Sequence, residues 1–520
     1  MASGYVVRKQ QYYDSIFLMG VNKRLSENRG VLQTAVLMGS EKNKQLLADI
    51  GIHGPQIDSA GPNDLIVAII ADTPQIVEAV LGKLDEALDR IQAGSIPSVL
   101  HTLEEGLAQK PNANLAVISI PGEYAAHEAR KALEAGLNVF LFSSNVSIED
   151  ELDLKQCALQ NNLLVMGPDC GTSLLGGIGI GFANIVRRGP IGVIGAAGTG
   201  LQEFTSQIHN AGLGISHAIG TGSHDVSDEI EGITTFTALE RLEADSQTKV
   251  IVFISKPLGA KTFTKLVERL QGCRKPAIGC FLGQPVEPLD RNTNLQCART
   301  IDEAVQLAAK HVTGSPLPPI QLTSEELEWA AREKAGWSPE QKYLRGVFAG
   351  GTFCYQSQQI LRDAGFAVHS NAPFAPQNRL SHPDQSLEHT LLDMGDDYYT
   401  LGKPHPMING TLRVQRILTE SLDHQVAILL LDFILGYNAS TDPVGELLDA
   451  ILEARQRVRK RGGSLTVVAS ICGTEDDPQD LNLQTQLLKE AGAIVFRSNA
   501  RATLFCCELL KHPLGGAHGK

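Results

Sequence analysis

This chain of 520 residues lacks CxxC motifs, long apolar runs and clusters of basic residues. Its nine cysteines are scattered without a CxxC pair, and Cys506 and Cys507 are adjacent in an apolar helical run. This usage is typical of reduced thiols and argues against a zinc site or a disulfide framework. No apolar run could span a bilayer, and the first residues lack the apolar core of a signal peptide. We therefore expect a cytoplasmic protein with no metal site.

The charge balance narrows the class of partner. The formal net charge is −13 at pH 7 and the pI is about 5.6, with no stretch dense in lysine or arginine. These values argue against nucleic acid and against an anionic membrane as partners. The chain is too long for one hydrophobic core, so we expect two to four domains.

Apolar strands alternate with helical stretches along nearly the whole chain. This pattern predicts an α/β protein of several parallel-sheet modules, Rossmann or flavodoxin-like in form. In the first module we expect strands at 5–7, 31–38 and 64–71, the last followed by a helix at 74–92. A proline-rich stretch, TGSPLPPIQL (313–322), indicates a stiff linker. The expected division is a first module at 1–105, a second at 106–188, a third at 189–312, a linker at 313–340 and a fourth at 341–514.

The third and fourth modules look like copies of one another. GVIGAAGTGLQEFTSQIHNAG (192–212) aligns with GVFAGGTFCYQSQQILRDAG (346–365), and in both the loop threonine lies 13 residues before the closing glycine. The next shared strands, at 250–259 and 426–436, require an insertion of roughly 23 residues in the fourth module, which we expect around 391–408. A duplicated fold predicts two similar sites, or one site built between the copies.

The glycine loops match neither of the common nucleotide-binding patterns. A dinucleotide fold requires GxGxxG, but Gly195, Gly198 and Gly200 are spaced as GxxGxG. A P-loop ends in GK[ST], and neither loop contains a lysine. A glycine loop that opens a helix still offers free N–H groups and the positive end of the helix dipole to an anion. Two such ends could clamp a phosphate, unless the glycines only allow tight packing; the clamp residues would be Ala197, Gly198, Thr199, Gly200, Gly350, Gly351 and Thr352.

One histidine is a candidate for acid–base chemistry. His405 lies between two prolines that fix its backbone, and three aspartates precede it in the expected insertion. Carboxylates near an imidazole can tune its pKa, and the ring can stabilise an oxyanion. We expect His405 and Asp396 to be catalytic, with Asp393 and Gly395 binding substrate. The alternative is a structural histidine in a loop.

The other candidate residues have structural alternatives. His217, Gly220 and His224 follow the first clamp helix and could contact the substrate or form a turn. Asp442 lies just after a strand end, where α/β proteins bind ligands, but it could equally cap a helix. We expect Cys170 to be a buried thiol rather than a nucleophile, and His127 to be a surface residue.

Several motifs resemble those of a known family. The first glycine loop, the upstream MGPDCGT and TTFTALERLEADSQTKVIVFISKP (234–257) are similar to the ligase part of the succinyl-CoA synthetase α subunit. Residues 341–514 resemble the C-terminal ligase domain of its β subunit. The third and fourth modules are then expected to be ligase-like and the second to be CoA-binding-like. The order of parts, with GEYAA and DMGDDYYTLGKPHPMI, is similar to the FdrA family of acyl-CoA-synthetase-like proteins.

The resemblance implies roles, and it also has departures. In succinyl-CoA synthetases two helix N-termini, one per subunit, hold the phosphate of a phosphorylated histidine, and the matching helices here start at 198–199 and 351–352. The glutamate that contacts this histidine is matched by Glu240, which is therefore implied to be catalytic. The histidine motif GHAGA is absent after PAIGCFLG (276–283), as are the CoA-binding glycine loop and an ATP-grasp domain. We therefore expect phosphate as a substrate, rather than CoA or a nucleotide as a cofactor.

The FdrA resemblance implies carbamoyl transfer during breakdown of ureido acids, in purine and allantoin catabolism, by an oligomer with partner subunits. We expect an enzyme that transfers an acyl or carbamoyl group to or from phosphate, best matched by a subunit of an oxamate or ureido-acid carbamoyltransferase. One alternative is a nucleotide-dependent acyl-CoA (succinate–CoA) ligase completed by another chain. The other is a non-catalytic scaffold subunit that binds phosphate or an effector.

Overall fold

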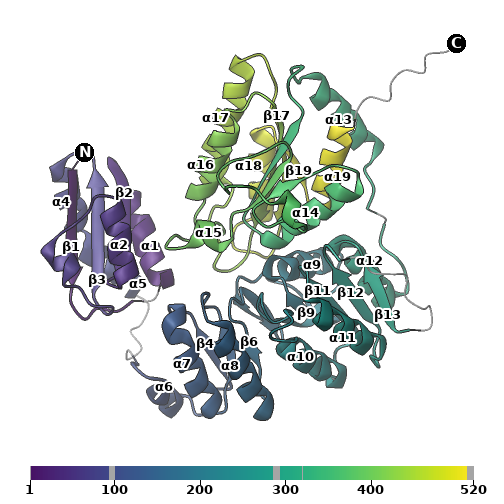
Figure 1. Ribbon diagram of the computed structural model, residues 1–520, viewed down its shortest axis with the longest axis horizontal. Coiled ribbons are helices and arrows are strands. Elements are labelled where there is room, and N and C mark those ends of the chain that lie inside the picture. Colours follow the sequence, from purple (N-terminus) through teal and green to yellow (C-terminus); the bar gives the residue numbers. More distant parts are fainter. Residues whose placement is uncertain (1, 14, 93–99, 285–292, 319, 512–520) are drawn as a thin grey trace. The chain divides into compact units, whose positions relative to one another are not determined.

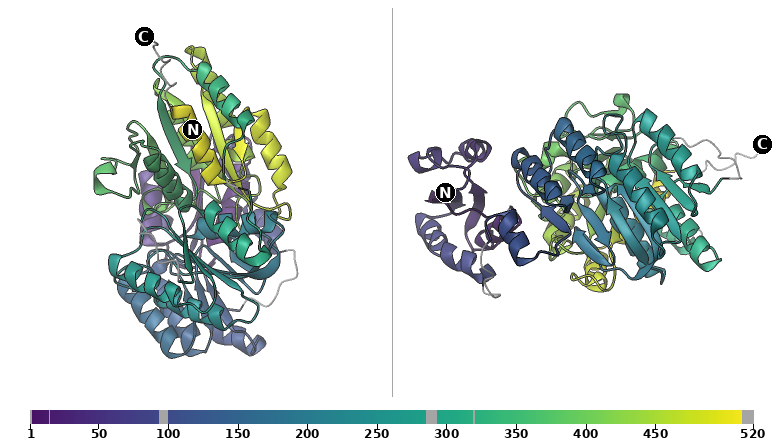
Figure 2. Two further views of the ribbon diagram at one scale, coloured as in Figure 1. Left: turned by 90° about the vertical axis from the view of Figure 1, so that its right-hand side faces the viewer. Right: turned by 90° about the horizontal axis from the view of Figure 1, so that it is seen from below.

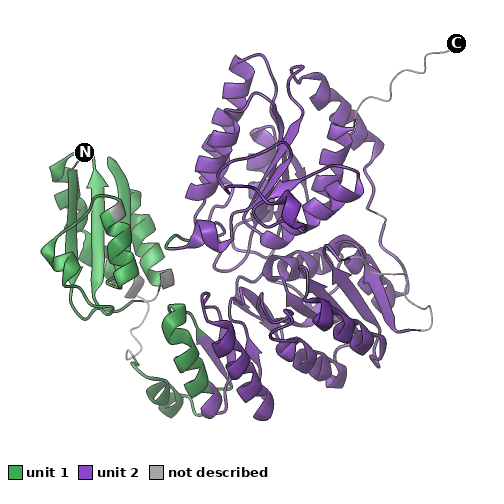
Figure 3. Cartoon of the chain, in the orientation of Figure 1, with its two compact units in different colours: residues 1–114, 118–132, 402–404 green, residues 115–117, 133–401, 405–520 purple. Residues whose placement is uncertain are grey.

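The computed structural model describes residues 2–13, 15–92, 100–284, 293–318 and 320–511, and the chain divides into two compact units (Figure 3). Unit 1 comprises residues 1–114, 118–132 and 402–404, and unit 2 comprises residues 115–117, 133–401 and 405–520. In the described part of the chain, no helix is both long and apolar enough to cross a membrane.

Unit 1 contains an antiparallel sheet, which corrects the parallel arrangement expected for the first module. β1 (Ala2–Arg8), β2 (Val31–Met38) and β3 (Leu65–Ala71) lie in the order β1-β3-β2, and β3 is antiparallel to both neighbours. The predicted strand positions are confirmed. Strand direction was not predictable in this way, because alternating side chains give the same apolar pattern in either direction.

Helices cover both faces of this sheet, so the apolar run LIVAIIA of β3 is buried on both sides. One helix had been expected at 74–92, but the segment forms two, and Gly82, a poor helix former, is the C-cap of the first. His127 lies exposed on the last helix of the unit, as predicted. The first face carries α1 (Ser15–Ser26), α4 (Pro74–Leu81) and α5 (Leu84–Gln92); the second carries α2 (Glu41–Asp49) and α3 (Pro55–Asp58); α6 (Leu103–Gln109) and α7 (Gly122–Glu134) follow.

Three further sheets can be followed in Figure 1, two of them large. The small one orders β4 (Leu115–Ile118), β5 (Asn138–Leu141) and β6 (Val165–Met166), with α8 (Ile148–Gln160) between the last two in sequence. The seven-stranded sheet has the order β13-β12-β11-β9-β10-β7-β8, in which the pairs β10–β7 and β7–β8 are antiparallel and the other pairs are parallel. Its strands are β7 (Thr172–Leu175), β8 (Ile178–Gly181), β9 (Arg188–Ala196), β10 (Ile215–Gly220), β11 (Val250–Ser255), β12 (Ala277–Phe281) and β13 (Leu295–Ala298).

The six-stranded sheet is wholly parallel, in the order β15-β16-β14-β17-β18-β19. Its strands are β14 (Tyr343–Phe348), β15 (His369–Ser370), β16 (Thr390–Asp393), β17 (Val426–Ile434), β18 (Thr466–Cys472) and β19 (Ile494–Phe496).

Each large sheet is covered by helices on both faces, as the views in Figures 1 and 2 show. On the seven-stranded sheet α9 (Gly198–Asn210) and α12 (Ile301–Thr313) share one apolar core, and α10 (Ile233–Ala244) and α11 (Ala260–Gln271) share the other. On the six-stranded sheet the first core takes in α13 (Ser324–Ala335), α14 (Gly351–Asp363) and α19 (Asn499–Leu510). The second takes in α16 (Thr411–Glu420), α17 (Gly445–Lys460) and α18 (Leu481–Glu490).

The two large sheets share a core of five parallel strands, in the orders β13-β12-β11-β9-β10 and β19-β18-β17-β14-β16, with β9 and β14 in equivalent positions. Four residues (211–214) separate α9 from β10, whereas 26 residues (364–389) separate α14 from β16, the strand that pairs with β14 as β10 pairs with β9. The insertion therefore precedes β16. The sequence had predicted it around 391–408, and that prediction was wrong. An alignment of two short strands could not place the gap, because β16 repeats no residue motif of β10.

Candidate functional site

The first turns of α9 and α14 lie against each other in unit 2. A methyl group added at Gly200 would lie 3.0 Å from Cγ2 of Thr352, and one added at Gly350 would lie 3.0 Å from Cγ2 of Thr199. Each helix directly follows the carboxyl end of the central strand of its sheet. The two helix N-termini therefore meet within one chain, and glycine at each contact leaves room for the opposite threonine.

Backbone N–H groups at this junction are open to a ligand. An α-helix leaves its first N–H groups without intrahelical partners, and its N-terminus carries roughly half a positive charge. Within the described residues, five amides of the two first turns have no protein acceptor: those of Gly198, Thr199, Gly200, Gly351 and Thr352. This arrangement suits a phosphate or carboxylate.

Gly350 does not offer its amide to a ligand, which corrects its predicted role. Asp432, within β17, accepts hydrogen bonds from the amides of Ala349 and Gly350 at 2.8 Å each, and it pairs with Arg413 at 2.9 Å. The carboxylate thus fixes the loop that opens α14. Ala197 is the N-cap of α9; its methyl group is buried, and its carbonyl accepts from the amide of Leu201.

Buried hydroxyl groups without partners surround the same junction. Thr352 is only 1% exposed, and its Oγ1 has no hydrogen-bond partner in the described part of the chain. The same holds for Oγ1 of Thr172, which lies 3.6 Å from a methyl group added at Gly198, and for Oγ of Ser255 at the end of β11. Buried polar atoms are normally satisfied, so this set indicates a place built for another group.

Sequence reasoning missed Lys256, which lies at this junction. Ser255 pairs with Ala196 in the ladder between β11 and β9, so Lys256 leaves the sheet beside the loop that opens α9. Its Nζ lies 3.2 Å from a methyl group added at Gly351. The signal that could have found it is positional, because a lysine directly after a buried strand lies at the edge where α/β proteins bind ligands.

His405 and Asp393 approach each other beside Gly395. A methyl group added at Gly395 would lie 2.8 Å from Nε2 of His405 and 3.2 Å from Oδ1 of Asp393. The Nδ1 atom of His405 accepts a hydrogen bond from the amide of Met407 at 3.2 Å, so Nε2 carries the proton of the neutral ring. The ring packs against Phe182, with 5.9 Å between centroids. This leaves an N–H donor next to a carboxylate.

Burial decides the charge of this pair. It raises the pKa of Asp393 to about 6, although Lys256 opposes the shift. It lowers the pKa of His405 to about 4, and the charge of Lys256 acts in the same direction. At neutral pH the imidazole is therefore uncharged, while the carboxylate takes up a proton just below neutrality. Such a pair can donate a hydrogen bond and accept a proton.

Asp396 and Asp442, both predicted site residues, have capping roles. Asp396 is the N-cap of α15 (Asp397–Thr400), and its Oδ1 accepts from the amide of Tyr398 at 3.0 Å. Its charge also acts on Asp393. Oδ1 of Asp442 accepts from the amide of Gly445 at the start of α17, which is the helix-capping alternative.

Glu240 and His217 are not brought to the helix N-termini. Glu240 is exposed near the end of α10; since that end leads into the start of β11, it lies at the opposite edge of the sheet. His217 lies within β10, and its Nδ1 accepts from the amide of Gly176 at 3.1 Å. The motif match that implied a catalytic Glu240 carried no information on which sheet edge the residue would occupy.

The three remaining predicted residues lie around the end of β10. Gly220 ends that strand, where an added methyl group would lie 2.2 Å from the carbonyl oxygen of Thr172. Nδ1 of His224 lies 3.4 Å from Glu151, whose hydrogen bond raises the histidine pKa. Cys170 is a buried free thiol, as predicted, and burial raises its pKa to about 12.

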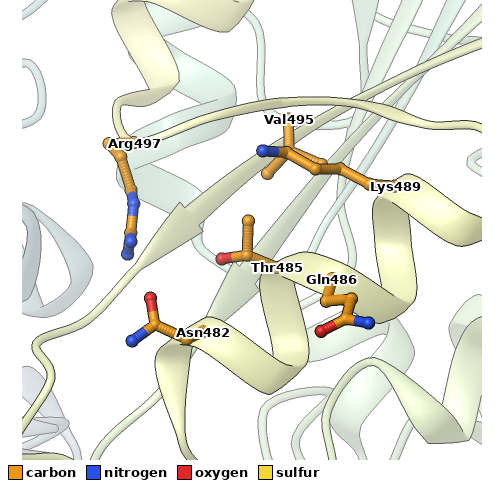
Figure 4. Close-up of a pocket in the computed structure, with 6 residues that line it drawn as sticks. All are labelled: Asn482, Thr485, Gln486, Lys489, Val495 and Arg497. Carbon is orange, nitrogen blue, oxygen red and sulfur yellow. The ribbon is translucent and has the colours of Figure 1, made fainter.

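Figure 4 shows a separate hollow on the six-stranded module. It contains none of the predicted site residues and is lined by Asn482, Thr485, Gln486 and Lys489 of α18 together with Val495 and Arg497. Among the residues that the structure describes, no group of three or more His, Cys, Asp or Glu side chains is placed to hold a metal ion.

Three family models match the chain. A CoA binding domain matches residues 186–270, a CoA-ligase domain matches 347–506, and the model described as "AllF, heavy metal-associated domain" matches 1–98. The fold and these matches define the class of protein as succinyl-CoA-synthetase-like. An AllF-type domain comes first along the chain, and the CoA-binding and CoA-ligase domains follow it. YahF of Escherichia coli (strain K12) is 40% identical over 98% of this chain and 99% of its own length. The chain belongs to the same family as YahF.

More distant relatives match only parts of the chain. The succinate–CoA ligase [ADP-forming] subunit alpha of Aquifex aeolicus (strain VF5) is 27% identical, over 37% of this chain and 69% of that protein. Among solved structures, the apo form of a dinucleotide-forming acetyl-coenzyme A synthetase 1 from Ca. Korarchaeum cryptofilum has a TM-score of 0.29 at 16% identity. That match covers 76% of this chain and 82% of the other, and it carries no functional argument.

The names of two of the matched domains, one for a heavy metal and one for CoA, can be compared with the residues of this chain. Residues 1–98 contain no cysteine and one histidine, His53, so they lack the thiolates that soft heavy metals prefer, and the metal in the domain's name does not fit them. The CoA binding model falls on 186–270, the region of the α9 loop, whereas the second module had been expected to be CoA-binding-like. The free amides there fit a phosphoryl group of CoA as well as free phosphate.

Proposed function

We propose that this chain transfers a carbamoyl or related acyl group to or from phosphate, as an FdrA-type subunit of a ureido-acid carbamoyltransferase. The supporting observation is the junction of two helix N-termini in one chain, with five amides that have no acceptor among the described residues. Each such end favours an anion by about 0.3–2 kcal/mol. The AllF-type domain at 1–98 supports a place in allantoin breakdown.

For a ureido acid, an oxygen of hydrogen phosphate attacks the terminal carbonyl carbon. A C–O bond forms, the C–N bond to the rest of the substrate breaks, and the phosphate proton ends on the departing nitrogen. The products are carbamoyl phosphate and the amino compound that carried the carbamoyl group, which is an amide when the substrate is oxalurate. Asp393 would carry the proton from the phosphate oxygen to the departing nitrogen. The Nε2–H group of His405 would donate to the carbonyl oxygen as negative charge develops on it.

The test uses the full chain with its partner subunits, phosphate and a panel of ureido acids that includes oxalurate. We expect carbamoyl phosphate, detected by ³¹P NMR, only when phosphate is present. Thr352→Val should lower the rate about tenfold or more, because it removes a buried hydroxyl at the junction. Thr264→Val, on the exposed side of α11, is the control. Absence of carbamoyl phosphate across the panel would overturn the proposal.

A second candidate is a nucleotide-dependent acyl-CoA ligase completed by another chain, and the CoA binding match over the α9 loop favours it. Here the same amides would hold a phosphoryl group during acyl transfer to CoA. The discriminating experiment incubates the complex with a nucleoside triphosphate, magnesium, CoA and a carboxylic acid. Formation of an acyl-CoA and an acid-labile phosphohistidine would favour the ligase over the carbamoyltransferase.

A further inference from the structure

Lys256 is a cation near two carboxylates, those of Asp169 and Asp393, but it is bonded to neither. Its side chain is half-buried and makes no salt bridge or hydrogen bond within the described residues. The Nζ atom lies 5.8 Å from the centre of the Tyr355 ring, on the face of α14 that begins at Gly351. An ammonium group that is partly desolvated and makes no direct ion pair is stabilised by a ligand that brings further negative charge.

The surroundings of Lys256 add to its positive charge. The free amides of Gly351 and Thr352 belong to the helix turn next to it, and those of α9 lie across the junction. Each helix N-terminus is equivalent to about half an elementary charge, so the two ends and the ammonium together offer about two positive charges. The ionised carboxylate of Asp393 offsets part of this charge. Because the attraction grows with the charge of the ligand, the remainder favours hydrogen phosphate or a phosphate monoester over a carboxylate or nitrate.

Two carboxylates, those of Asp169 and Asp393, interact with the charge of this group, and that of Asp393 lies at the start of α14. Oδ2 of Asp393 would lie 2.3 Å from a methyl group added at Gly351, the same position that approaches Nζ of Lys256. Asp393 directs Oδ1 to the amide of Gly395 at 3.0 Å. It is thus held by its own loop beside the ammonium, on the side where His405 also lies.

We propose that Lys256 binds the phosphoryl group held between α9 and α14 and makes this site selective for dianions over monoanions. This inference rests on the proposed function, in that the same junction holds phosphate. Free phosphate, a carbamoyl or acyl phosphate and a phosphoryl group of CoA share the required chemistry. Lys256 then takes the place of a covalent attachment, because charge rather than a bond to a histidine retains the phosphoryl group.

The experiment is isothermal titration calorimetry of the full chain with inorganic phosphate, sulfate and nitrate at pH 8. We expect Lys256→Met to weaken phosphate and sulfate binding about tenfold to a hundredfold and to abolish the preference over nitrate. Lys256→Arg should retain the preference, since it keeps the charge. Lys265→Met is the control, because that lysine is exposed and pairs with Glu231.

The outcomes separate this inference from the proposed function. If the wild-type chain binds phosphate and a folded Lys256→Met variant binds it equally well, Lys256 has no such role and the clamp alone holds the anion. If Lys256→Arg loses selectivity while its thermal unfolding is unchanged, charge is not the cause and the inference fails. A wild-type chain that binds no phosphate would overturn both.

Discussion

Thr199 and Thr352 occupy equivalent places in two copies of one fold, and each lies against a glycine of the opposite loop. The contacts are reciprocal, Thr199 with Gly350 and Thr352 with Gly200. Because α9 and α14 belong to separate sheets, this junction depends on how the two modules pack. Buried polar contacts hold that packing, among them the hydrogen bond from the amide of Asn499 to Glu203 at 3.0 Å.

Gly351→Ala should damage both stability and phosphate binding. The new Cβ would lie 2.3 Å from Oδ2 of Asp393, so the buried carboxylate would have to move. We expect a loss of about 1–3 kcal/mol in the free energy of unfolding by urea, and weaker phosphate binding by calorimetry. Gly106→Ala is the matched control: nothing lies within 4 Å of its Cβ, so it should stabilise by up to about 1 kcal/mol. Equal behaviour of the two variants would contradict the close approach.

The proposed reaction should lose activity on the acid side near pH 6. Burial raises the pKa of Asp393 to about 6, so a carboxylate that accepts protons is lost below that pH. His405, whose pKa burial lowers to about 4, stays neutral throughout this range. The measurement is kcat/KM from pH 5 to pH 9, expressed per concentration of the phosphate dianion so that the titration of phosphate itself does not contribute. Asp393→Asn should abolish most activity and remove the fall of kcat/KM on the acid side. If that fall persists unchanged in the variant, it is caused by the titration of another group.

Glu203→Gln should stabilise the chain at alkaline pH. Burial, and next the charge of Asp302, raise the pKa of Glu203 above its unfolded value of about 4.3. Its contribution to stability is therefore complete below about pH 4.3 and is lost as the pH rises toward the folded pKa. We expect the melting temperature of the wild type to fall more between pH 5 and pH 8 than that of the variant. Glu240→Gln, at an exposed position, should follow the wild type; equal pH dependence in all three proteins would refute the assignment.

Asp432→Asn should be among the most damaging single changes at the junction. It leaves the buried guanidinium of Arg413 without its carboxylate and weakens the acceptor for the amides of Ala349 and Gly350. Breaking a buried pair costs about 3–5 kcal/mol, to be measured by urea unfolding. Asp442→Asn, in a capping role at α17, should cost little, because asparagine caps a helix about as well as aspartate, and it should leave phosphate binding unchanged. A smaller loss for Asp432→Asn than for Asp442→Asn would show that the pair does not support the loop.

Much of the site could be expected from local sequence signals. The glycines and threonines at 198–200 and 351–352 mark two helix starts because loop chemistry and helix capping involve neighbouring residues. Lys256 gave no comparable signal, since its importance comes from the pairing of β11 with β9. Glu240 shows the converse error: a matched motif placed it in the site, but its position near the end of α10 puts it at the wrong edge of the sheet.

The sequence by itself determined the strand positions of the first module, the duplication and the two helix starts that follow glycine loops. These follow from apolar periodicity and turn residues, which act over a few positions. Only the tertiary structure decided that β3 runs antiparallel to its neighbours, that the amide of Gly350 is taken by Asp432, and that Lys256 lies beside the start of α14. Strand direction, occupied donors and unpaired charges depend on residues far apart in the chain, which become neighbours only when the sheets pack.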